Sequence, residues 1–196
     1  ELAMEYDKNR RLYHDMNNHN LVMWKLAEKG EYERLHKYIG KLRPLEKDRH
    51  RQWTQNLILD MILEYKLLAM EKKKILYEIK TDMIGEIALA DKELCILLGN
   101  LLDNAIEACE KLEEKKRMVK IEVRKHHSMF MLIVENSCEA HAQVRKGIFR
   151  TTKKDDRMHG YGIHNVRKTV KNRGGQFQYG SRGENFYVKI LIPLVI

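Results

Sequence analysis

The sequence lacks paired cysteines and long apolar runs. Its three cysteines, Cys95, Cys109 and Cys138, are odd in number and form no Cys-x-x-Cys pair. This pattern argues against a disulfide framework and a zinc knuckle, and it indicates reduced thiols in a cytosolic compartment. No apolar run reaches the ~20 residues that cross a bilayer, and no signal peptide is visible. The sequence therefore gives no sign of a membrane span or of a disulfide-built secreted scaffold.

Residues that break helices are almost absent from positions 1–72, where Pro44 is the only proline and Gly30 and Gly40 are the only glycines. We expect helix through most of this part, with a stop at Gly30 and a break at Pro44. Two apolar stripes at helical spacing predict a hairpin whose second helix covers about 54–73. Two helices alone bury too little surface, so we expect two chains to pair into a four-helix bundle. The stripes are Leu12, Met16, His19, Met23 and Leu26, then Leu57, Met61, Tyr65 and Leu68.

The periodicity changes near residue 73. Alternating apolar residues predict strands at 75–79, 119–125, 129–135, 177–179 and 186–192, and helical spacing predicts helices at 91–115 and from Ile163 to a stop at Gly174-Gly175. The polar stretch over 136–160 is longer than ordinary connections and predicts a lid or binding loop. The expected fold class is α+β: a helical hairpin over 1–72, then a mostly antiparallel α/β layer over 73–196.

The charge balance is strongly basic, with 37 Lys and Arg against 28 Asp and Glu, a net charge of +9. It favours an acidic partner such as a nucleotide, an acidic protein pocket, nucleic acid or an anionic membrane surface. Nucleic acid is the weakest of these, because the basic residues are spread among acids rather than set in one stripe with aromatics. The chain begins without Met in a charged helical pattern, so we expect a soluble fragment whose upstream part was removed.

The segment Cys95–Glu110 is dense in Leu, Ile and Ala and predicts a buried helix. Asn100 and Asn104 do not fit a buried helix, and because they are four residues apart they share one face. Amide oxygens are hard ligands that suit Mg²⁺, which usually arrives with phosphates. The alternative is a helix with two hydrogen-bonded core amides, and this helix alone does not decide between the two.

A second candidate group is the segment His14-Asp15-Met16-Asn17-Asn18-His19. A lone helical histidine usually has no function. His14, however, lies two residues from Leu12 and from Met16, so it points away from the apolar stripe. The adjacent Asp15 can take the Nδ1 proton or fix the tautomer, leaving Nε2 free to attack. His19 is the competing candidate, but it lies on the stripe and we expect it to be packed.

Three further segments carry polar or glycine residues where a nucleotide could bind. Asn136 follows Val134-Glu135 at a strand end, from which it could read a base edge. Glycines just before a helix, as in His159-Gly160-Tyr161-Gly162, let backbone N–H groups meet a phosphate, although an ordinary turn has the same pattern. Thr151-Thr152-Lys153-Lys154 offers hydroxyl and ammonium groups, although such runs are usually solvated loops.

Together and in this order, these segments resemble sensor histidine kinases of the GHKL superfamily over nearly the whole chain. Asn-Leu-Leu-Asp-Asn-Ala-Ile-Glu-Ala, with Asn100, Asp103 and Asn104, closely resembles the N-box. The H-box pattern His-Asp-x-x-x-Asn-His resembles the segment with His14, Asp15, Asn18 and His19, in which the last pair has the matching spacing. The run from Thr151 to Val166 resembles the lid and G2 box of the peptide quorum-sensing (AgrC-like) subfamily, and Val-Glu-Asn-Ser resembles its replacement for the Asp-x-Gly-x-Gly box.

The resemblance implies a fold, an activity and partners. Residues 1–72 would be a dimerisation and histidine phosphotransfer domain, and 73–196 a GHKL (Bergerat-type) α/β sandwich that binds ATP and Mg²⁺. His14 would accept the phosphoryl group with Asp15 assisting, and a response-regulator receiver aspartate would take it next. The protein would be a homodimer on the cytoplasmic side of the cell membrane, attached only through a missing N-terminal sensor region. The implied nucleotide-binding set is Asn100, Asp103, Asn104 (also the Mg²⁺ ligand), Asn136, Thr151, Thr152, Lys153, His159, Gly160 and Gly162.

Two residues depart from the family pattern. Most members have Asp where Asn136 stands, and an uncharged acceptor predicts weak nucleotide binding. Members that hydrolyse ATP carry Glu where Asn100 stands, so its absence suits transfer to histidine. Asn18 could orient a water that dephosphorylates the regulator, or it could set helix register. The alternative to a kinase is a catalytically weakened GHKL-like dimeric scaffold.

Overall fold

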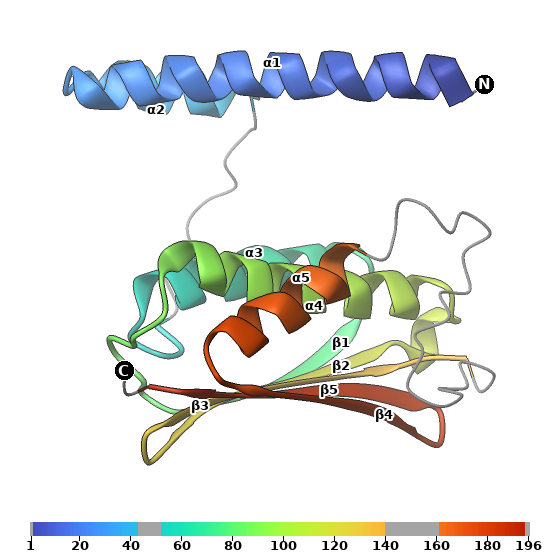
Figure 1. Cartoon of the computed structure of the whole chain (residues 1–196). Helices are drawn as coiled ribbons and strands as arrows, with labels where there is room; N and C mark the ends of the chain where they lie inside the picture. Colours follow the sequence, from blue (N-terminus) through green and yellow to red (C-terminus); the bar gives the residue numbers. More distant parts are fainter. Residues whose placement is uncertain (1, 43–51, 140–160, 195–196) are drawn as a thin grey trace. The chain divides into compact units, whose positions relative to one another are not determined.

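The computed structural model describes residues 2–42, 52–139 and 161–194. It divides into two compact units, Glu1–Arg49 and His50–Ile196. Figure 1 gives the element labels; the units are not placed relative to each other. Among the helices in the described ranges, none combines the length and apolarity that a bilayer span requires.

The first unit is a pair of helices, α1 (Leu2–Glu28) and α2 (Tyr32–Leu42). Gly30 ends α1 as expected. It adopts a positive φ of 70°, and the Glu31 N–H donates to Leu26 O at 2.9 Å, a helix-ending arrangement that favours glycine. The two helices leave Leu12 and Met16 exposed. A second chain could cover these side chains, and the four-helix bundle stays a prediction.

The expected second helix of the hairpin belongs to the second unit instead. This helix, α3 (Leu57–Lys72), packs against α4 and contributes Leu59, Leu63, Leu67 and Met70 to the core of that unit. The stripe of Leu57, Met61 and Tyr65 is exposed, and the face of α3 that the unit buries is a different one, with Leu59 and Leu63. The boundary expected at residue 72 therefore lies between Arg49 and His50. Because α3 is apolar on two faces, periodicity alone could not identify the buried one.

The second unit is a five-stranded sheet with helices on one face, as Figure 1 shows. The strand order is β1-β2-β3-β5-β4; β1 pairs with β2 in parallel and the other pairs are antiparallel. The expected strands and helices are confirmed, with shifts of a few residues at their ends. They are β1 (Leu76–Thr81), α4 (Asp91–Glu110), the short 3₁₀ helix η1 (Glu114–Lys116), β2 (Met118–His126), β3 (Met129–Ser137), α5 (Tyr161–Asn172), β4 (Gln176–Arg182) and β5 (Asn185–Pro193).

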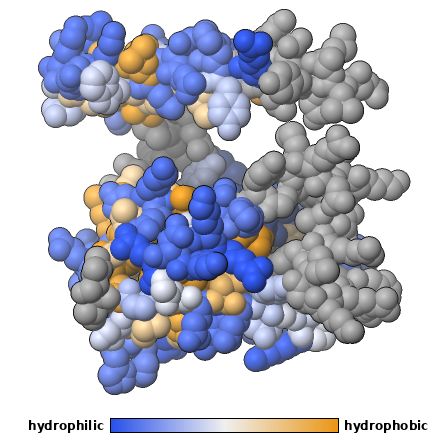
Figure 2. Space-filling model, viewed as in Figure 1, coloured by the Kyte–Doolittle hydropathy of each residue, from blue (hydrophilic) through white to orange (hydrophobic). Residues whose placement is uncertain are grey.

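The core lies between the sheet and the helices. Alternate residues of β3, Phe130, Leu132 and Val134, are buried on the helix-covered face, and matching rows of β2 and β5 flank them. Helix α4 supplies a continuous set of buried leucines. The outward side of α5 is hydrophilic, as the blue region over α5 in Figure 2 shows, and it includes Arg167 and Lys168.

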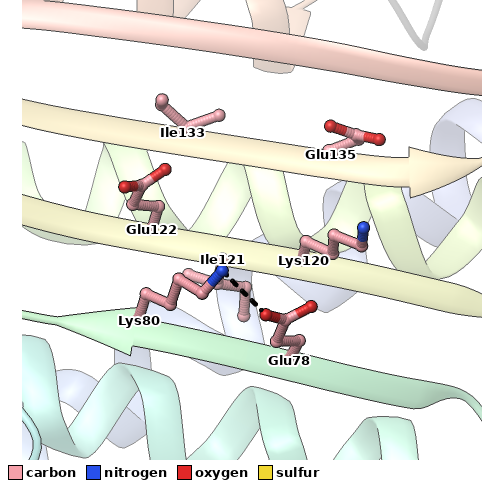
Figure 3. A pocket seen from close by; sticks show the side chains of 7 residues that line it. All are labelled: Glu78, Lys80, Lys120, Ile121, Glu122, Ile133 and Glu135. Carbon is pink, nitrogen blue, oxygen red and sulfur yellow. Dashed lines mark ion pairs between the residues drawn. The ribbon is translucent and has the colours of Figure 1, made fainter. Parts of the chain in front are cut away.

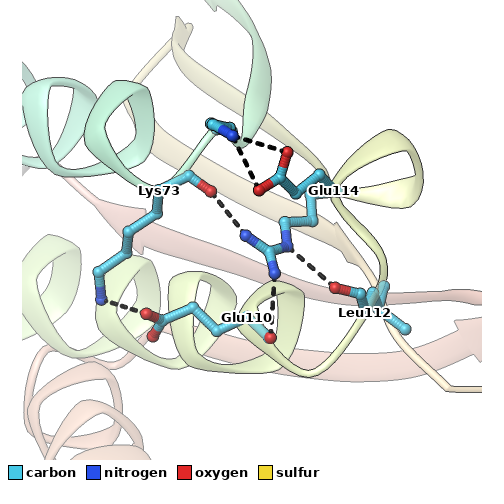
Figure 4. A network of polar contacts seen from close by, with 6 residues as sticks. Lys73, Glu110, Leu112 and Glu114 are labelled. Atoms are coloured by element: carbon cyan, nitrogen blue, oxygen red, sulfur yellow. Dashed lines mark hydrogen bonds and ion pairs between the residues drawn. The ribbon is translucent and has the colours of Figure 1, made fainter.

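Arg117 joins the C-terminal ends of α3 and α4 (Figure 4). Its guanidinium donates to Lys73 O at 2.8 Å, Leu112 O at 3.0 Å and Glu110 O at 3.3 Å. An ion pair of 2.8 Å between Lys73 and Glu110 lies beside it. Helix ends leave carbonyl groups without partners inside the helix, so a cation there satisfies acceptors and complements the helix dipole. The junction fixes α4 relative to α3.

Candidate functional site

The first unit presents His14 to solvent on α1, with 76% of its side chain exposed. Asn18 Nδ2 lies 3.2 Å from His14 Nδ1, and Asp15 Oδ1 lies 3.8 Å from the same nitrogen. Asn18, one turn along the helix, is therefore the side chain within hydrogen-bond distance of the ring, and Asp15 is an electrostatic neighbour. Both engage the Nδ1 side and leave Nε2 accessible. The ring can act as an acceptor at Nε2 in the tautomer that carries its proton on Nδ1, and the neighbouring Asp15 carboxylate favours that tautomer.

His19 is the less accessible histidine of the pair. It is half-buried, and its Nδ1 lies 2.8 Å from the Tyr38 hydroxyl of α2. The expectation that His19 is packed is confirmed. A contact to α2 restricts its ring, and this favours His14 over His19 as the reactive group.

The second unit brings Asn100 of α4 against the first turn of α5. Asn100 Nδ2 donates to Ile96 O at 2.7 Å, which fixes the direction of the amide. A Cβ atom added to Gly162 would lie 2.8 Å from Asn100 Oδ1, closer than ordinary contacts allow. The absence of a side chain at Gly162 therefore lets the start of α5 approach the amide. Asn104 lies one turn further along α4 and is exposed.

Asn136 is a buried amide at the end of β3, with 5% of its surface exposed. It continues the inward row of Phe130 and Val134 and so lies on the helix-covered face. Its Nδ2 donates to Ser137 O at 2.9 Å, which leaves the amide oxygen as its acceptor group. Cys109 Sγ of α4 lies 3.7 Å from the same Ser137 O, so the last turns of α4 cover this strand end. Burial raises the pKa of the Cys109 thiol, which suits a packing role.

Asp103 was expected among the nucleotide-binding residues, and the structure directs it elsewhere. Its Oδ1 lies 2.5 Å from Lys66 Nζ of α3. Asn100, in contrast, meets α5 through Gly162. The structure therefore brings Asn100 and Gly162 together and does not add Asp103 to them. Five other predicted residues, Thr151, Thr152, Lys153, His159 and Gly160, lie outside the described residues and stay predictions.

Two side chains that the sequence analysis did not identify hold α5 against the start of α4. Arg173, just beyond α5, donates through Nε to Glu93 Oε1 at 2.7 Å and through Nη2 to Oε2 at 2.5 Å. Glu93 also accepts from the Ala90 N–H at 2.8 Å, closing the first turn of α4. The hydrogen bond from Arg173 holds the pKa of Glu93 below its ordinary value. A glutamate at the third position of a helix, as Glu93 is, weakly predicts a capping role. No local sequence pattern predicts that Arg173 would be its partner.

The donor set of this region fits a metal that arrives with a nucleotide. In the described ranges, no group of three or more His, Cys, Asp or Glu side chains could hold a metal ion by itself. The amides of Asn100 and Asn104 supply neutral, hard oxygens, and Mg²⁺ bound to phosphates needs only one or two protein ligands. The residues present therefore fit a nucleotide-bound Mg²⁺ better than a metal held by protein alone.

A shallow pocket on the opposite face of the sheet offers a less suitable site (Figure 3). It lies over β1, β2 and β3, and a 3.0 Å ion pair between Glu78 and Lys80 occupies part of it. Three carboxylates there would repel a triphosphate. The lining residues are Glu78, Lys80, Lys120, Ile121, Glu122, Ile133 and Glu135.

Comparisons with known proteins point to one family. A family model described as a GHKL domain matches residues 89–193, more than half of the chain. The nucleotide-free catalytic domain of histidine kinase ThkA shares 21% identity at a TM-score of 0.57, covering 72% of this chain and 94% of that one. Acinetobacter baumannii histidine kinase AdeS shares 16% identity (TM-score 0.53; 85% and 82% covered), and mycobacterial sensor histidine kinase MprB shares 16% (0.52; 69% and 93%). No curated protein matches.

At these identities the solved structures show the fold alone, which is that of histidine kinase catalytic domains. The family match covers α4, the strands from β2 to β5 and α5, the elements that carry Asn100, Asn104, Asn136 and Gly162. The chain belongs to the GHKL domain family.

Proposed function

We propose that the chain is the catalytic part of a sensor histidine kinase. It binds ATP with Mg²⁺ on the second unit, transfers the γ-phosphoryl group to His14, and passes that group to an aspartate on a response regulator. The observation that carries the proposal is the approach of Gly162 to the Asn100 amide, which joins the N-box helix to the start of the helix that follows the lid segment. Within the histidine kinases, the sequence motifs favour the peptide quorum-sensing subfamily for this chain.

Each residue of the second unit would have a separate task. Asn104, exposed one turn beyond Asn100, would hold Mg²⁺, which would neutralise phosphate charge during transfer. The amide oxygen of Asn136 would accept from the adenine amino group. Asn100 and Gly162 would shape the phosphate side of the site. The residues outside the described ranges, Thr151, Thr152, Lys153, His159 and Gly160, would contact the triphosphate.

The first unit would supply the acceptor. His14 Nε2 would attack with the ring proton on Nδ1, and the Asp15 carboxylate near Nδ1 would offset the positive charge that develops on the ring. Its 76% exposure suits a side chain that must meet both a nucleotide and a receiver domain. The exposed Leu12 and Met16 on the same helix support pairing of two chains into a bundle, so the active form would be a homodimer.

Titration calorimetry with ATP and Mg²⁺ tests nucleotide binding. The native chain should bind saturably, and Asn104→Ala should bind at least about tenfold more weakly because a hard oxygen ligand is lost. Gln178→Ala, which removes an exposed amide from β4, is the matched control and should bind like the native chain. A folded native chain that shows no binding at millimolar ATP would contradict the proposal.

A further inference from the structure

Lys66 is a buried cation next to the N-box helix. Its side chain on α3 is 11% exposed, and its Nζ lies 2.5 Å from Asp103 Oδ1 on α4. Asp103 itself is 56% exposed, so it stands at the rim of the helix pair rather than inside the core. A buried ammonium group requires a charged partner, and removing that partner leaves an uncompensated charge. The pair therefore fixes where the Asp103 carboxylate points.

This direction matters because Asp103 directly precedes Asn104. Successive side chains on a helix are about 100° apart, so Asp103 and Asn104 diverge while Asn100 and Asn104 share a face. Lys66 draws Asp103 toward α3, whereas Asn100 meets Gly162 on the α5 side. Without Lys66, a flexible carboxylate would stand one residue from the proposed Mg²⁺ ligand.

An unpaired Asp103 would change the chemistry at Asn104 in two ways. A carboxylate is a stronger ligand for Mg²⁺ than a neutral amide, so it could bind the metal before any nucleotide arrives. It would also add a negative charge near the triphosphate, and like charges repel. An amide-only ligand set has neither property.

We propose, as an inference that rests on the proposed nucleotide site, that Lys66 is a positioning residue that withholds the Asp103 carboxylate from Mg²⁺ and phosphate. The pair makes metal binding at Asn104 conditional on nucleotide. In this proposal the ion pair with Lys66 of α3 keeps Asp103 away from the nucleotide, so Asp103 is not a nucleotide ligand.

A double-mutant cycle with separate metal and nucleotide readouts tests this assignment. Lys66→Met keeps the packed stem and removes the charge, Asp103→Asn removes the carboxylate, and the double variant removes both. Thermal unfolding with Mg²⁺ alone should show no metal response for the native chain and a clear stabilisation for Lys66→Met. ATP affinity measured by calorimetry should fall about tenfold in Lys66→Met and return to within about threefold of native in the double variant. Lys66→Arg should behave like the native chain.

The outcomes separate the inference from the function on which it rests. If every variant loses ATP affinity in step with its loss of thermal stability, and none responds to Mg²⁺ alone, the pair is structural only and the inference is wrong. If the native chain fails to bind ATP, the proposed function itself fails. Should either single variant not fold, the double variant, which leaves no unpaired charge, still decides: ATP affinity within about threefold of native supports the inference, and a loss of about tenfold overturns it.

Discussion

Replacing Gly162 with alanine is the sharpest perturbation of the proposed nucleotide site. The new Cβ would lie 2.8 Å from Asn100 Oδ1 and 3.4 Å from Asn100 Cγ. Comfortable contacts between such atoms begin near 3.5 Å, so the amide must move by roughly 0.7 Å. The amide is the end of a flexible side chain, and it therefore gives way while the backbone of α4 and α5 stays in place.

We expect Gly162→Ala to lower ATP affinity and to leave the free energy of unfolding nearly unchanged. Moving the amide weakens the bond from Asn100 Nδ2 to Ile96 O, which contributes about 1 kcal/mol. Alanine regains roughly 0.5–1 kcal/mol in helix propensity, so the free energy of unfolding should change little. A displaced amide oxygen no longer matches its ligand, and we expect ATP affinity to fall about tenfold, equivalent to about 1.4 kcal/mol.

The assay is calorimetric titration of ATP and Mg²⁺ together with urea unfolding. Gly99→Ala is the matched control, since it precedes Asn100 on the same helix and a Cβ there would meet nothing within 4 Å. It should raise the free energy of unfolding by up to about 1 kcal/mol and leave ATP affinity unchanged. Native ATP affinity in Gly162→Ala would refute the assignment of the Asn100–Gly162 contact to the nucleotide site.

Three further predictions concern stability, pH and base recognition. Arg117→Ala should lower the free energy of unfolding by about 2–3 kcal/mol in urea, because three carbonyl groups at the ends of α3 and α4 lose their donor; a change under 0.5 kcal/mol would contradict this. The hydrogen bond from Arg173 holds the folded-state pKa of Glu93 below its ordinary value, so the stabilisation is present above the ordinary pKa of a glutamate and is lost as pH falls through the folded-state pKa. The melting temperature of Glu93→Gln should therefore fall less steeply between pH 6 and pH 3 than that of the native chain. Parallel curves for the two proteins would contradict this role of Glu93. Asn136→Asp should tighten ATP binding, because a charged acceptor forms the stronger hydrogen bond. An unchanged dissociation constant would contradict the proposed contact between residue 136 and adenine.

Local patterns predicted the elements of this fold better than their pairing. Alternation located β2, β3 and β5, and the run around Asn100 located α4, because each buries one clear face. The same approach failed on α3, whose two apolar faces are equivalent in sequence although only the side with Leu59 and Leu63 is buried. The parallel pairing of β1 with β2 was also hidden, since period-2 alternation does not encode strand direction.

The candidate site divides in the same way. Short-range geometry was predictable: the shared face of Asn100 and Asn104, and the accessible position of His14 against the packed His19. Long-range partners were not. The pairs Lys66–Asp103 and Glu93–Arg173 join segments far apart in the chain, and no local pattern identifies a partner across that separation.

Phosphate transfer from γ-labelled ATP is the most direct test of the account. The native chain and His14→Gln would be incubated with labelled ATP and Mg²⁺, and the bound label tested for stability in acid and alkali. The account predicts acid-labile, alkali-stable label on the native chain and none on His14→Gln. Label that persists on His14→Gln would move the acceptor, with His19 as the first alternative. A native chain that binds ATP but takes up no label would contradict the kinase and favour the dimeric scaffold.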